Sequence, residues 1–263
     1  MPASSPAAPA LQVEVDGDGP TVVLAHGFTQ TGRLWGRFGQ VLADGHRLVR
    51  VDLPGHGGSS DVRADLVAGG ALLAAAGAVG GAIESGSASF DLVGYSLGAR
   101  FALHAALAWP DLVRRLVLIG GTAGIDDPDV RADRRRRDDA LADGLASSGD
   151  VDGFVRRWLA APMFAGLVTP APAERRRNTA GGLASSLRLA GAGTQAPLWD
   201  RLSAVTTPTL VVVGATDLRF AALGRRLVAG LPDAVLSVVP GAGHAAHLHQ
   251  PDLVARLVRQ FLG

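Results

Sequence analysis

Ser96 has the surroundings that nucleophilic or general-base chemistry requires. It is the centre of Gly94-Tyr95-Ser96-Leu97-Gly98, which follows an apolar run and begins a helical one. A sharp turn from strand to helix needs glycines around the serine because it leaves no room for Cβ atoms. Such a turn also presents the hydroxyl at a helix N-terminus, whose dipole favours developing negative charge. The pentapeptide therefore predicts a nucleophile at the end of a strand.

A reactive serine needs a histidine to take its proton and a carboxylate to orient that histidine. Asp217 follows the predicted strand Thr209–Gly214, and His244 follows a predicted strand that ends near Val239. Both therefore lie where ligands bind in open parallel sheets. Taken alone, Asp217 could cap a helix and His244 could belong to a surface loop. The order Ser, Asp, His along the chain is that of the α/β-hydrolase fold and predicts a catalytic triad.

The segment His26-Gly27-Phe28 predicts an oxyanion hole. It follows the predicted strand Thr21–Ala25, at the point where this fold supplies a backbone N–H to a developing negative charge. The predicted donors are the N–H groups of Phe28 and Leu97. We expect His26 to brace the turn rather than to take part in the chemistry.

The other histidines indicate structural roles. His244, His247 and His249 are closely spaced, but no pair of carboxylates accompanies them, so we predict no metal site. We expect His247 and His249 to cap a helix or to face solvent. His56 lies in the loop Asp52–Ser59 beside the predicted site, where we expect it to be structural. Nothing in the sequence calls for a cofactor.

Short aliphatic runs alternate with potential helices, a pattern typical of βαβ units and a mostly parallel twisted sheet flanked by helices. A weak first strand is predicted at Leu11–Val15, and helices that cover the sheet are predicted at Phe101–Ala108 and Pro251–Leu262. The predicted strands are Thr21–Ala25, Leu48–Leu53, Phe90–Gly94, Leu116–Ile119, Thr209–Gly214 and Ala234–Val239.

The alternation stops between about residues 123 and 202, where the sequence becomes helical and rich in arginine. Helices are predicted at Val130–Leu145, at Val151–Ala160 and after Pro172. The simplest interpretation is one α/β domain over residues 1–263 with a helical cap inserted between two strands. The charge run Arg134–Arg137 suits a solvated helix face or a binding function equally well.

Composition excludes several classes of protein. Nearly half of the 263 residues are hydrophobic (48%), which allows a large core, and the net charge of +1 gives no reason to expect a nucleic-acid or membrane-surface partner. The absence of cysteine excludes thiolate chemistry and Cys-ligated metals. Residues 1–10 suggest a flexible tail rather than a signal peptide. The uncharged run Leu66–Ile83 is mostly Ala and Gly, so we expect a helix packed on the sheet, no membrane span, and a cytoplasmic protein.

Four segments and the insertion resemble one family within this fold. The segments are His26-Gly-Phe-Thr-Gln30, Asp52-Leu-Pro-Gly-His-Gly-Gly-Ser59, Gly94-Tyr-Ser-Leu-Gly-Ala-Arg100 and Gly241-Ala-Gly-His-Ala-Ala-His247. Together with Arg131–Asp138, Trp158–Phe164 and Gly182–Arg188 in the insertion, they are similar to 2-succinyl-6-hydroxy-2,4-cyclohexadiene-1-carboxylate synthases of menaquinone biosynthesis. The arginine after the serine motif and the insertion motifs favour this family, because the triad motifs are common to the whole fold.

The resemblance implies a lyase rather than a hydrolase. In that family the triad acts as a base on 2-succinyl-5-enolpyruvyl-6-hydroxy-3-cyclohexene-1-carboxylate, which then eliminates pyruvate. A small polycarboxylate needs fixed cations in its pocket, preferably bidentate ones. By motif matching, the implied substrate-binding residues are Tyr95, Arg100, Arg134, Trp158, Arg219 and, within the run Arg175–Arg177, Arg175 and Arg177.

Other interpretations of these residues stay open. Tyr95 could simply pack beside the serine turn, and Trp158 could belong to the core of the cap. A serine hydrolase, either an esterase or a carbon–carbon bond hydrolase for a small carboxylated substrate, would use the same triad. A non-catalytic binding module would need neither triad nor oxyanion loop. The sequence does not indicate the oligomeric state.

Overall fold

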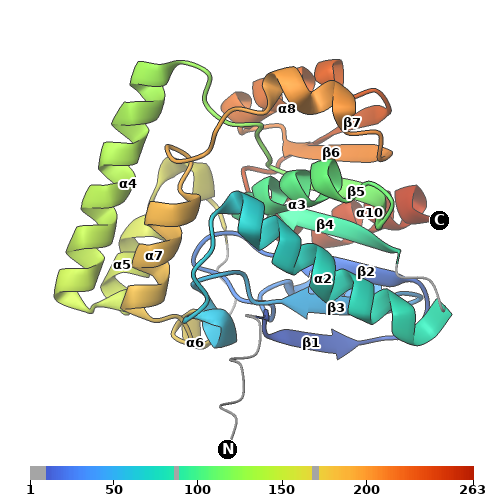
Figure 1. Ribbon diagram of the computed structural model, residues 1–263, viewed down its shortest axis with the longest axis horizontal. Helices are drawn as coiled ribbons and strands as arrows, with labels where there is room; N and C mark the ends of the chain where they lie inside the picture. Colours follow the sequence, from blue (N-terminus) through green and yellow to red (C-terminus); the bar gives the residue numbers. More distant parts are fainter. Residues whose placement is uncertain (1–9, 86–88, 168–171) are drawn as a thin grey trace, which may run out of the picture.

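The computed structural model describes residues 10–85, 89–167 and 172–263, and most of the expected N-terminal tail lies outside them. A seven-stranded sheet forms the centre, in the order β1-β3-β2-β4-β5-β6-β7 (Figure 1). Among these strands, only β1 runs antiparallel to its neighbour. The strands are β1 (Val13–Asp16), β2 (Thr21–Ala25), β3 (Arg47–Val51), β4 (Phe90–Tyr95), β5 (Val113–Ile119), β6 (Thr209–Gly214) and β7 (Ala234–Val239).

The predicted strands are confirmed, with shifts at some ends. β2, β6 and β7 have the predicted bounds, whereas β3 ends at Val51 instead of Leu53. The chain leaves the sheet at this point because the Asp52 N–H donates to Gln12 O and the Leu53 N–H donates to the His26 ring. β5 begins earlier than predicted, at Val113, because Val113 pairs with Phe90 of β4. Arg114 in this part of the strand pairs with the buried carboxylate of Asp91.

Helices cover both faces of the sheet because successive strand residues point to opposite sides. One core forms between the sheet and the helices α1 (Gly36–Ala43), α9 (Ala246–His249) and α10 (Pro251–Leu262). The other forms beneath α2 (Leu66–Ser85), α3 (Leu97–Ala108) and α8 (Leu218–Gly230). The helix predicted at 101–108 begins four residues earlier, at Leu97, directly after Ser96.

The helical insertion lies between β5 and β6, beyond one end of the sheet (Figure 1). It contains α4 (Pro128–Ser148), α5 (Val151–Leu159), η2 (Pro162–Phe164), α6 (Pro172–Arg175), α7 (Ala180–Ala190) and η3 (Trp199–Ala204). α4, α5 and α7 bury a small core of their own, and Phe28 from the loop after β2 packs against it. We call this insertion the cap. Its core joins the cap to the loop after β2.

The glycine-rich helix α2 packs on strands β2, β3 and β4, as expected, and also packs closely against α3. A Cβ atom on Gly69 would overlap the Phe101 ring, which is fully buried and has no space to move. Among the described residues, no helix combines the length and apolar character needed to cross a membrane.

This packing predicts opposite effects for two glycine-to-alanine changes. Gly69→Ala should destabilise the fold by about 1–2 kcal/mol, because overpacking costs more than the gain in helix propensity. Gly144→Ala, on the exposed side of α4 with open space around it, should stabilise by roughly 0.5–1 kcal/mol. Urea unfolding of both variants measures the two changes. Equal effects at the two positions would contradict the close α2–α3 contact.

Candidate active site

Ser96 lies on a strained turn between β4 and α3. Its φ is +52°, a left-handed value that non-glycine residues rarely adopt. The flanking glycines allow the turn to be tight: a Cβ on Gly94 would stand 2.5 Å from Gly98 O, and one on Gly98 would overlap the Ala25 carbonyl oxygen at the end of β2. The backbone therefore has the sharp strand-to-helix turn that the sequence predicts.

The structure brings Ser96, His244 and Asp217 together from three separate loops. Ser96 Oγ lies 2.9 Å from His244 Nε2, and His244 Nδ1 lies 3.1 Å from Asp217 Oδ2. The other Asp217 oxygen, Oδ1, accepts a hydrogen bond from the Phe220 N–H and so caps α8. Burial alone would raise the pKa of Asp217, but the hydrogen bonds from His244 and Phe220 outweigh it and lower that pKa. The carboxylate is thus held ionised beside the imidazole.

Both predicted oxyanion donors lie beside Ser96. Phe28 and Leu97 line the same cavity as Ser96 and His244. Leu97 is the first residue of α3, where backbone N–H groups have no partner within the helix. Among the described residues, no backbone carbonyl in a turn, loop or cap accepts a hydrogen bond from the N–H of Phe28 or of Leu97. This placement is compatible with the predicted role.

His26 and His56 are structural, as expected. His26 contacts Gly27 O through Nδ1 and accepts from the Leu53 N–H, so it links two loops. His56 Nδ1 lies 3.0 Å from Pro54 O, and the two rings meet edge to face. Burial is the main cause that lowers the pKa of His26 to about 4 and that of His56 to about 3.

The expectation for His247 is wrong: it neither faces solvent nor caps a helix. Its ring is fully buried among Trp35, Phe38 and Tyr95, and neither ring nitrogen has a partner among the described residues. Burial is the main cause that lowers its pKa to about 3, with smaller effects from His244 and His249. His247 sits on the short helix α9, which turns this side chain inward beneath Tyr95.

A cavity of about 860 Å³ extends from Ser96 and His244 to the cap. Four of the predicted substrate-binding residues line it: Arg100, Arg134, Trp158 and Arg219. The Arg100 side chain is buried, only 8% exposed, and its Nη1 has no hydrogen-bond partner in the part of the chain that the structure describes. Burial first, and the charge of Arg134 second, lower the pKa of Arg100 to about 10, which leaves it cationic at neutral pH.

Arg134 is held in this cavity by an acidic partner that the sequence did not lead us to expect. Its Nε donates to Asp138 Oδ1 over 2.9 Å, and the Asp138 side chain is almost fully buried. The i,i+4 spacing on α4 is a signal that the sequence contained, but the charge run around it suggested a solvated face. Trp158 packs against Phe28 and Phe154, so it is part of the cap packing as well as of the cavity wall.

A second, smaller cavity shares Ser96 and Trp158 with the first and is lined by Tyr95 and Arg175. Tyr95 packs against His247 and His244, and its burial raises the pKa of its phenol. Arg175 is only 3% exposed, and its Nη1 donates to Thr29. Burial lowers the pKa of Arg175 to about 10. Both residues therefore line a cavity together with Ser96.

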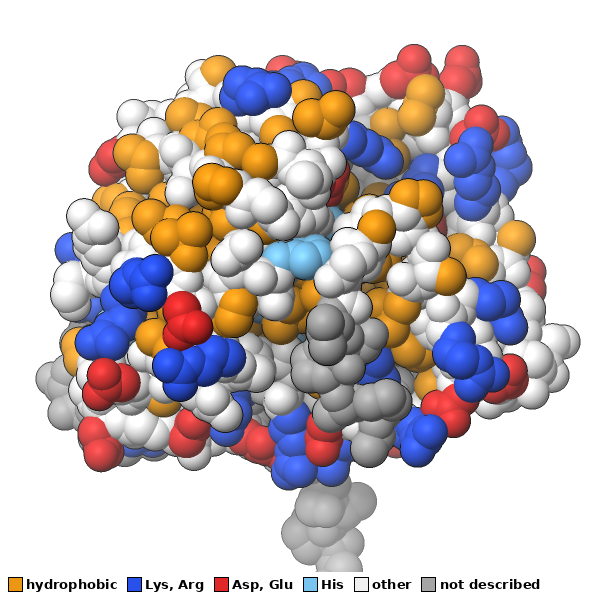
Figure 2. Space-filling model, turned by 180° about the vertical axis from the view of Figure 1, so that it is seen from behind, with side chains coloured by type: hydrophobic (Ala, Val, Ile, Leu, Met, Phe, Trp, Pro, Cys, Tyr) orange, Lys and Arg blue, Asp and Glu red, His pale blue; other side chains and the backbone are white. Residues whose placement is uncertain are grey.

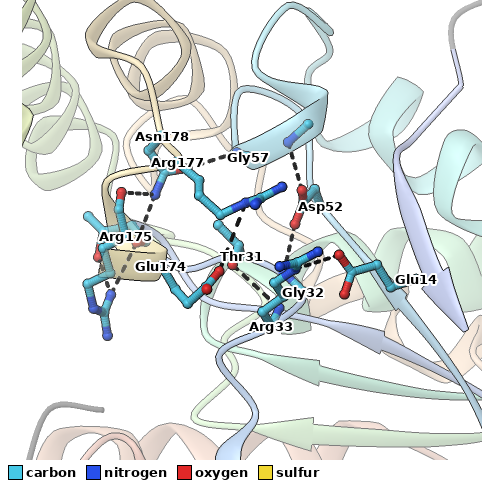
Figure 3. Close-up of polar contacts among 12 residues, drawn as sticks. Glu14, Thr31, Gly32, Arg33, Asp52, Gly57, Glu174, Arg175, Arg177 and Asn178 are labelled. Atoms are coloured by element: carbon cyan, nitrogen blue, oxygen red, sulfur yellow. Dashed lines mark hydrogen bonds and ion pairs between the residues drawn. The ribbon is translucent and has the colours of Figure 1, made fainter. Parts of the chain in front are cut away.

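Arg177 is a predicted site residue that the structure places elsewhere. Its guanidinium is half exposed, lies 3.9 Å from Glu174 and lines neither cavity (Figure 3). α6 ends at Arg175 and Arg177 lies in the turn that follows it, so the two side chains leave the backbone in different directions. Arg175 therefore points inward and Arg177 outward.

Charges on the reverse face are mixed. Where side chains are coloured in Figure 2, arginines and acidic residues lie close to one another around the lower edge, and apolar groups gather higher up.

Among the described residues, no group of three or more His, Asp or Glu side chains is arranged to hold a metal ion. The buried cations Arg100 and Arg175, by contrast, lie beside Ser96.

Comparisons with known proteins agree with this geometry. Residues 22–257 match the family described as "Alpha/beta hydrolase family". The 2-succinyl-6-hydroxy-2,4-cyclohexadiene-1-carboxylate synthase of Escherichia coli O1:K1 is 33% identical over 92% of this chain and 94% of its own. The structure of MenH from S. aureus matches with a TM-score of 0.85 at 26% identity, over 95% of this chain and 97% of that one. A thermophilic esterase from Thermogutta terrifontis, with malate bound, has a TM-score of 0.80 at 26% identity, over 96% and 92%.

The buried histidine predicts a dependence of stability on pH. The pKa of His247 falls from an ordinary value of 6.5 to about 3 on folding, so the unfolded chain binds a proton that the folded protein excludes. The contribution of neutral His247 to the free energy of unfolding is fully present above about pH 6.5. It is lost at about 1.4 kcal/mol per pH unit as the pH falls toward 3. His247→Phe should remove that slope.

Urea unfolding of both proteins between about pH 7.5 and 5 measures this difference. The difference in unfolding free energy should move in favour of the variant as the pH falls, whatever the packing cost of the larger ring. His247→Leu should show the same change of slope. Parallel curves for all three proteins would mean that folding does not lower the pKa of His247.

Proposed function

Because the chain belongs to the alpha/beta hydrolase family, we propose that it is a 2-succinyl-6-hydroxy-2,4-cyclohexadiene-1-carboxylate synthase. This lyase would remove pyruvate from 2-succinyl-5-enolpyruvyl-6-hydroxy-3-cyclohexene-1-carboxylate, in menaquinone biosynthesis. The observation that carries the proposal is Arg100, a buried arginine that forms no ion pair among the described residues and lines the cavity beside Ser96.

A buried cation without a partner is costly unless a ligand supplies the opposite charge. Arg134 lines the same cavity, and within the described residues one carboxylate, that of Asp138, is paired with it. A substrate carboxylate would complete this group of charges through bidentate hydrogen bonds. An apolar acyl chain would leave Arg100 unpaired, so the cavity suits an anionic substrate better than a simple fatty ester.

The proposed reaction is a base-promoted elimination. The hydrogen to be removed is on the ring carbon that bears the succinyl group, where the adjacent carbonyl makes it acidic. Ser96 Oγ takes this proton while its own proton passes to His244 Nε2, and Asp217 stabilises the imidazolium. The electron pair forms the new ring double bond, the existing one shifts, and the bond from ring carbon to enolpyruvyl oxygen breaks. The leaving enolate is protonated and becomes pyruvate.

Two further groups would support this step. As the proton leaves, negative charge develops on the succinyl carbonyl oxygen, and the N–H groups of Phe28 and Leu97 would stabilise it. Arg100, Arg134 and Trp158 would hold the substrate on the cap side. Arg219, at the exposed start of α8, would contact it at the rim, and Tyr95 and Arg175 would contact it in the smaller cavity.

A serine hydrolase for a small carboxylated ester is the second candidate. The 2.9 Å contact between Ser96 Oγ and His244 Nε2 suits a nucleophilic serine as well as a basic one. The likeness to the malate-bound esterase supports the same alternative. The two candidates differ in the product that a carboxylated substrate yields.

Pyruvate release tests the proposed function. The unstable cyclohexene substrate is generated in situ by the enzyme that forms it, and pyruvate is followed with lactate dehydrogenase. We expect release well above the spontaneous rate, with poor cleavage of p-nitrophenyl butyrate. Ser96→Ala should reduce release by about 10³-fold or more, because the step loses its base. Release at the spontaneous rate together with fast ester cleavage would establish the hydrolase instead.

Arg100→Met should separate carboxylate binding from the chemistry. We expect kcat/KM for pyruvate release to fall by about 10–100-fold, since a charge-assisted hydrogen bond contributes about 1.5–3 kcal/mol. Cleavage of a neutral p-nitrophenyl ester should change little. The free variant should unfold at the same temperature as the parent or higher, because it no longer buries an unpaired cation.

Arg136→Ala is the matched control for this change, because Arg136 is exposed on the same cap and pairs with Asp133. It should leave both activities unchanged. If Arg100→Met lowered neutral-ester cleavage as strongly as pyruvate release, Arg100 would not act as the carboxylate-binding group.

A further inference from the structure

The loop that carries the proposed oxyanion donor Phe28 is a strained turn. Gln30 N–H donates to Gly27 O over 3.1 Å, which closes a four-residue turn. Thr29, the third residue of this turn, has φ +66°. Turns with a positive φ at this position usually have glycine or asparagine there, and a β-branched residue is costly. Something outside the turn must therefore hold Thr29.

The cap supplies the groups that hold it. Asn178 Nδ2 donates to the Thr29 carbonyl oxygen over 3.0 Å, and Arg175 Nη1 donates to the same oxygen over 3.2 Å and to Thr29 Oγ1 over 2.7 Å. Thr29 is fully buried, so water cannot replace these donors. Both donors come from the end of α6 and the turn that follows it, almost 150 residues away along the chain.

Asn178 also fixes two other segments. Its Nδ2 donates a second hydrogen bond to Arg175 O, and its Oδ1 accepts from the Gly57 N–H over 3.0 Å (Figure 3). These partners determine the orientation of the amide, because two carbonyl oxygens face the nitrogen and one N–H faces the oxygen. An aspartate at this position would keep the bond to Gly57 but would have no proton to donate to Thr29.

We propose that Asn178 is a positioning residue for the oxyanion turn. By holding Thr29 O from the cap, it sets the conformation of Gly27–Gln30 and thereby the direction of the Phe28 N–H. The cap then contributes to charge stabilisation during the reaction as well as to substrate binding. The inference rests on the proposed use of the Phe28 N–H, but it holds for a lyase and for a hydrolase.

The test compares Asn178→Asp and Asn178→Ala with the parent. Removal of an oxyanion donor costs about 10²–10³-fold in kcat, so a misdirected donor should cost about 10–100-fold. We expect this loss in kcat, with KM changed by less than about 3-fold, for pyruvate release and for cleavage of neutral p-nitrophenyl acetate. Labelling of Ser96 by a fluorophosphonate, which also needs the oxyanion donors, should slow by a similar factor.

Arg176→Ala is the matched control, because Arg176 is a neighbour in the same segment that forms an exposed ion pair with Asp152. It should leave kcat and labelling unchanged. Hydrogen exchange provides a readout that is independent of activity. In both Asn178 variants, amides of residues 27–31 should exchange faster, while those of α10 should be unaffected.

The possible outcomes separate this inference from the proposed function. If the parent releases no pyruvate, the proposed function fails, while ester cleavage, labelling and exchange still test Asn178. Unchanged kcat and unchanged exchange in Asn178→Asp would overturn the inference. A change in KM alone would also overturn it, because it would mean that Asn178 acts on substrate binding through Arg175. If Asn178→Ala fails to fold, the isosteric Asn178→Asp decides.

Discussion

Gly98 lies so close to the end of β2 that no side chain fits between α3 and the Ala25 carbonyl oxygen. This contact places the N-terminus of α3 against the loop that begins at His26. Because β2 and β4 are paired and end at the same edge of the sheet, the contact also keeps Ser96 and Phe28 close together. The positive φ of Ser96 is the local cost of that arrangement. His244 and Asp217 reach the same point because β6 and β7 end at the same edge of the sheet.

Charged side chains of the cap surround the arginine that α3 contributes to the cavity. Arg100 belongs to α3, but the residues that act on it, Arg134 and Asp138, belong to α4. A packed apolar core of cap residues, joined by Phe28, fixes the helices of the cap above the site. The desolvation of guanidinium groups opposes folding, so the apolar packing of the cap must stabilise what the charges destabilise. The buried charges of the cavity consequently depend on the apolar packing of the cap.

Much of this could be predicted from local sequence. The strands were predictable because short aliphatic runs between turn signals are typical of a buried parallel sheet, and Ser96, Asp217 and His244 each follow such a strand. Arg177 was predicted to bind substrate but lines neither cavity, because the local sequence does not determine which side chain of Arg175–Arg177 points inward. His247 was placed wrongly because the aromatic pocket around it is formed by Trp35, Phe38 and Tyr95, which lie far away along the chain. Asn178 was missed because its partners, Thr29 and Gly57, are more than a hundred residues away.

Most of the Arg100 side chain is already shielded from solvent before any ligand arrives, so most of its dehydration is part of folding and not of binding. An entering carboxylate must give up its own hydration, but little further desolvation of the arginine is needed on binding. Many small anions would gain from such an encounter. Selection among them then depends on the spacing between Arg100, Arg134 and Ser96, which only a molecule of suitable length can match. The distance between the arginines and Ser96 would therefore limit the length of the molecules that can contact both.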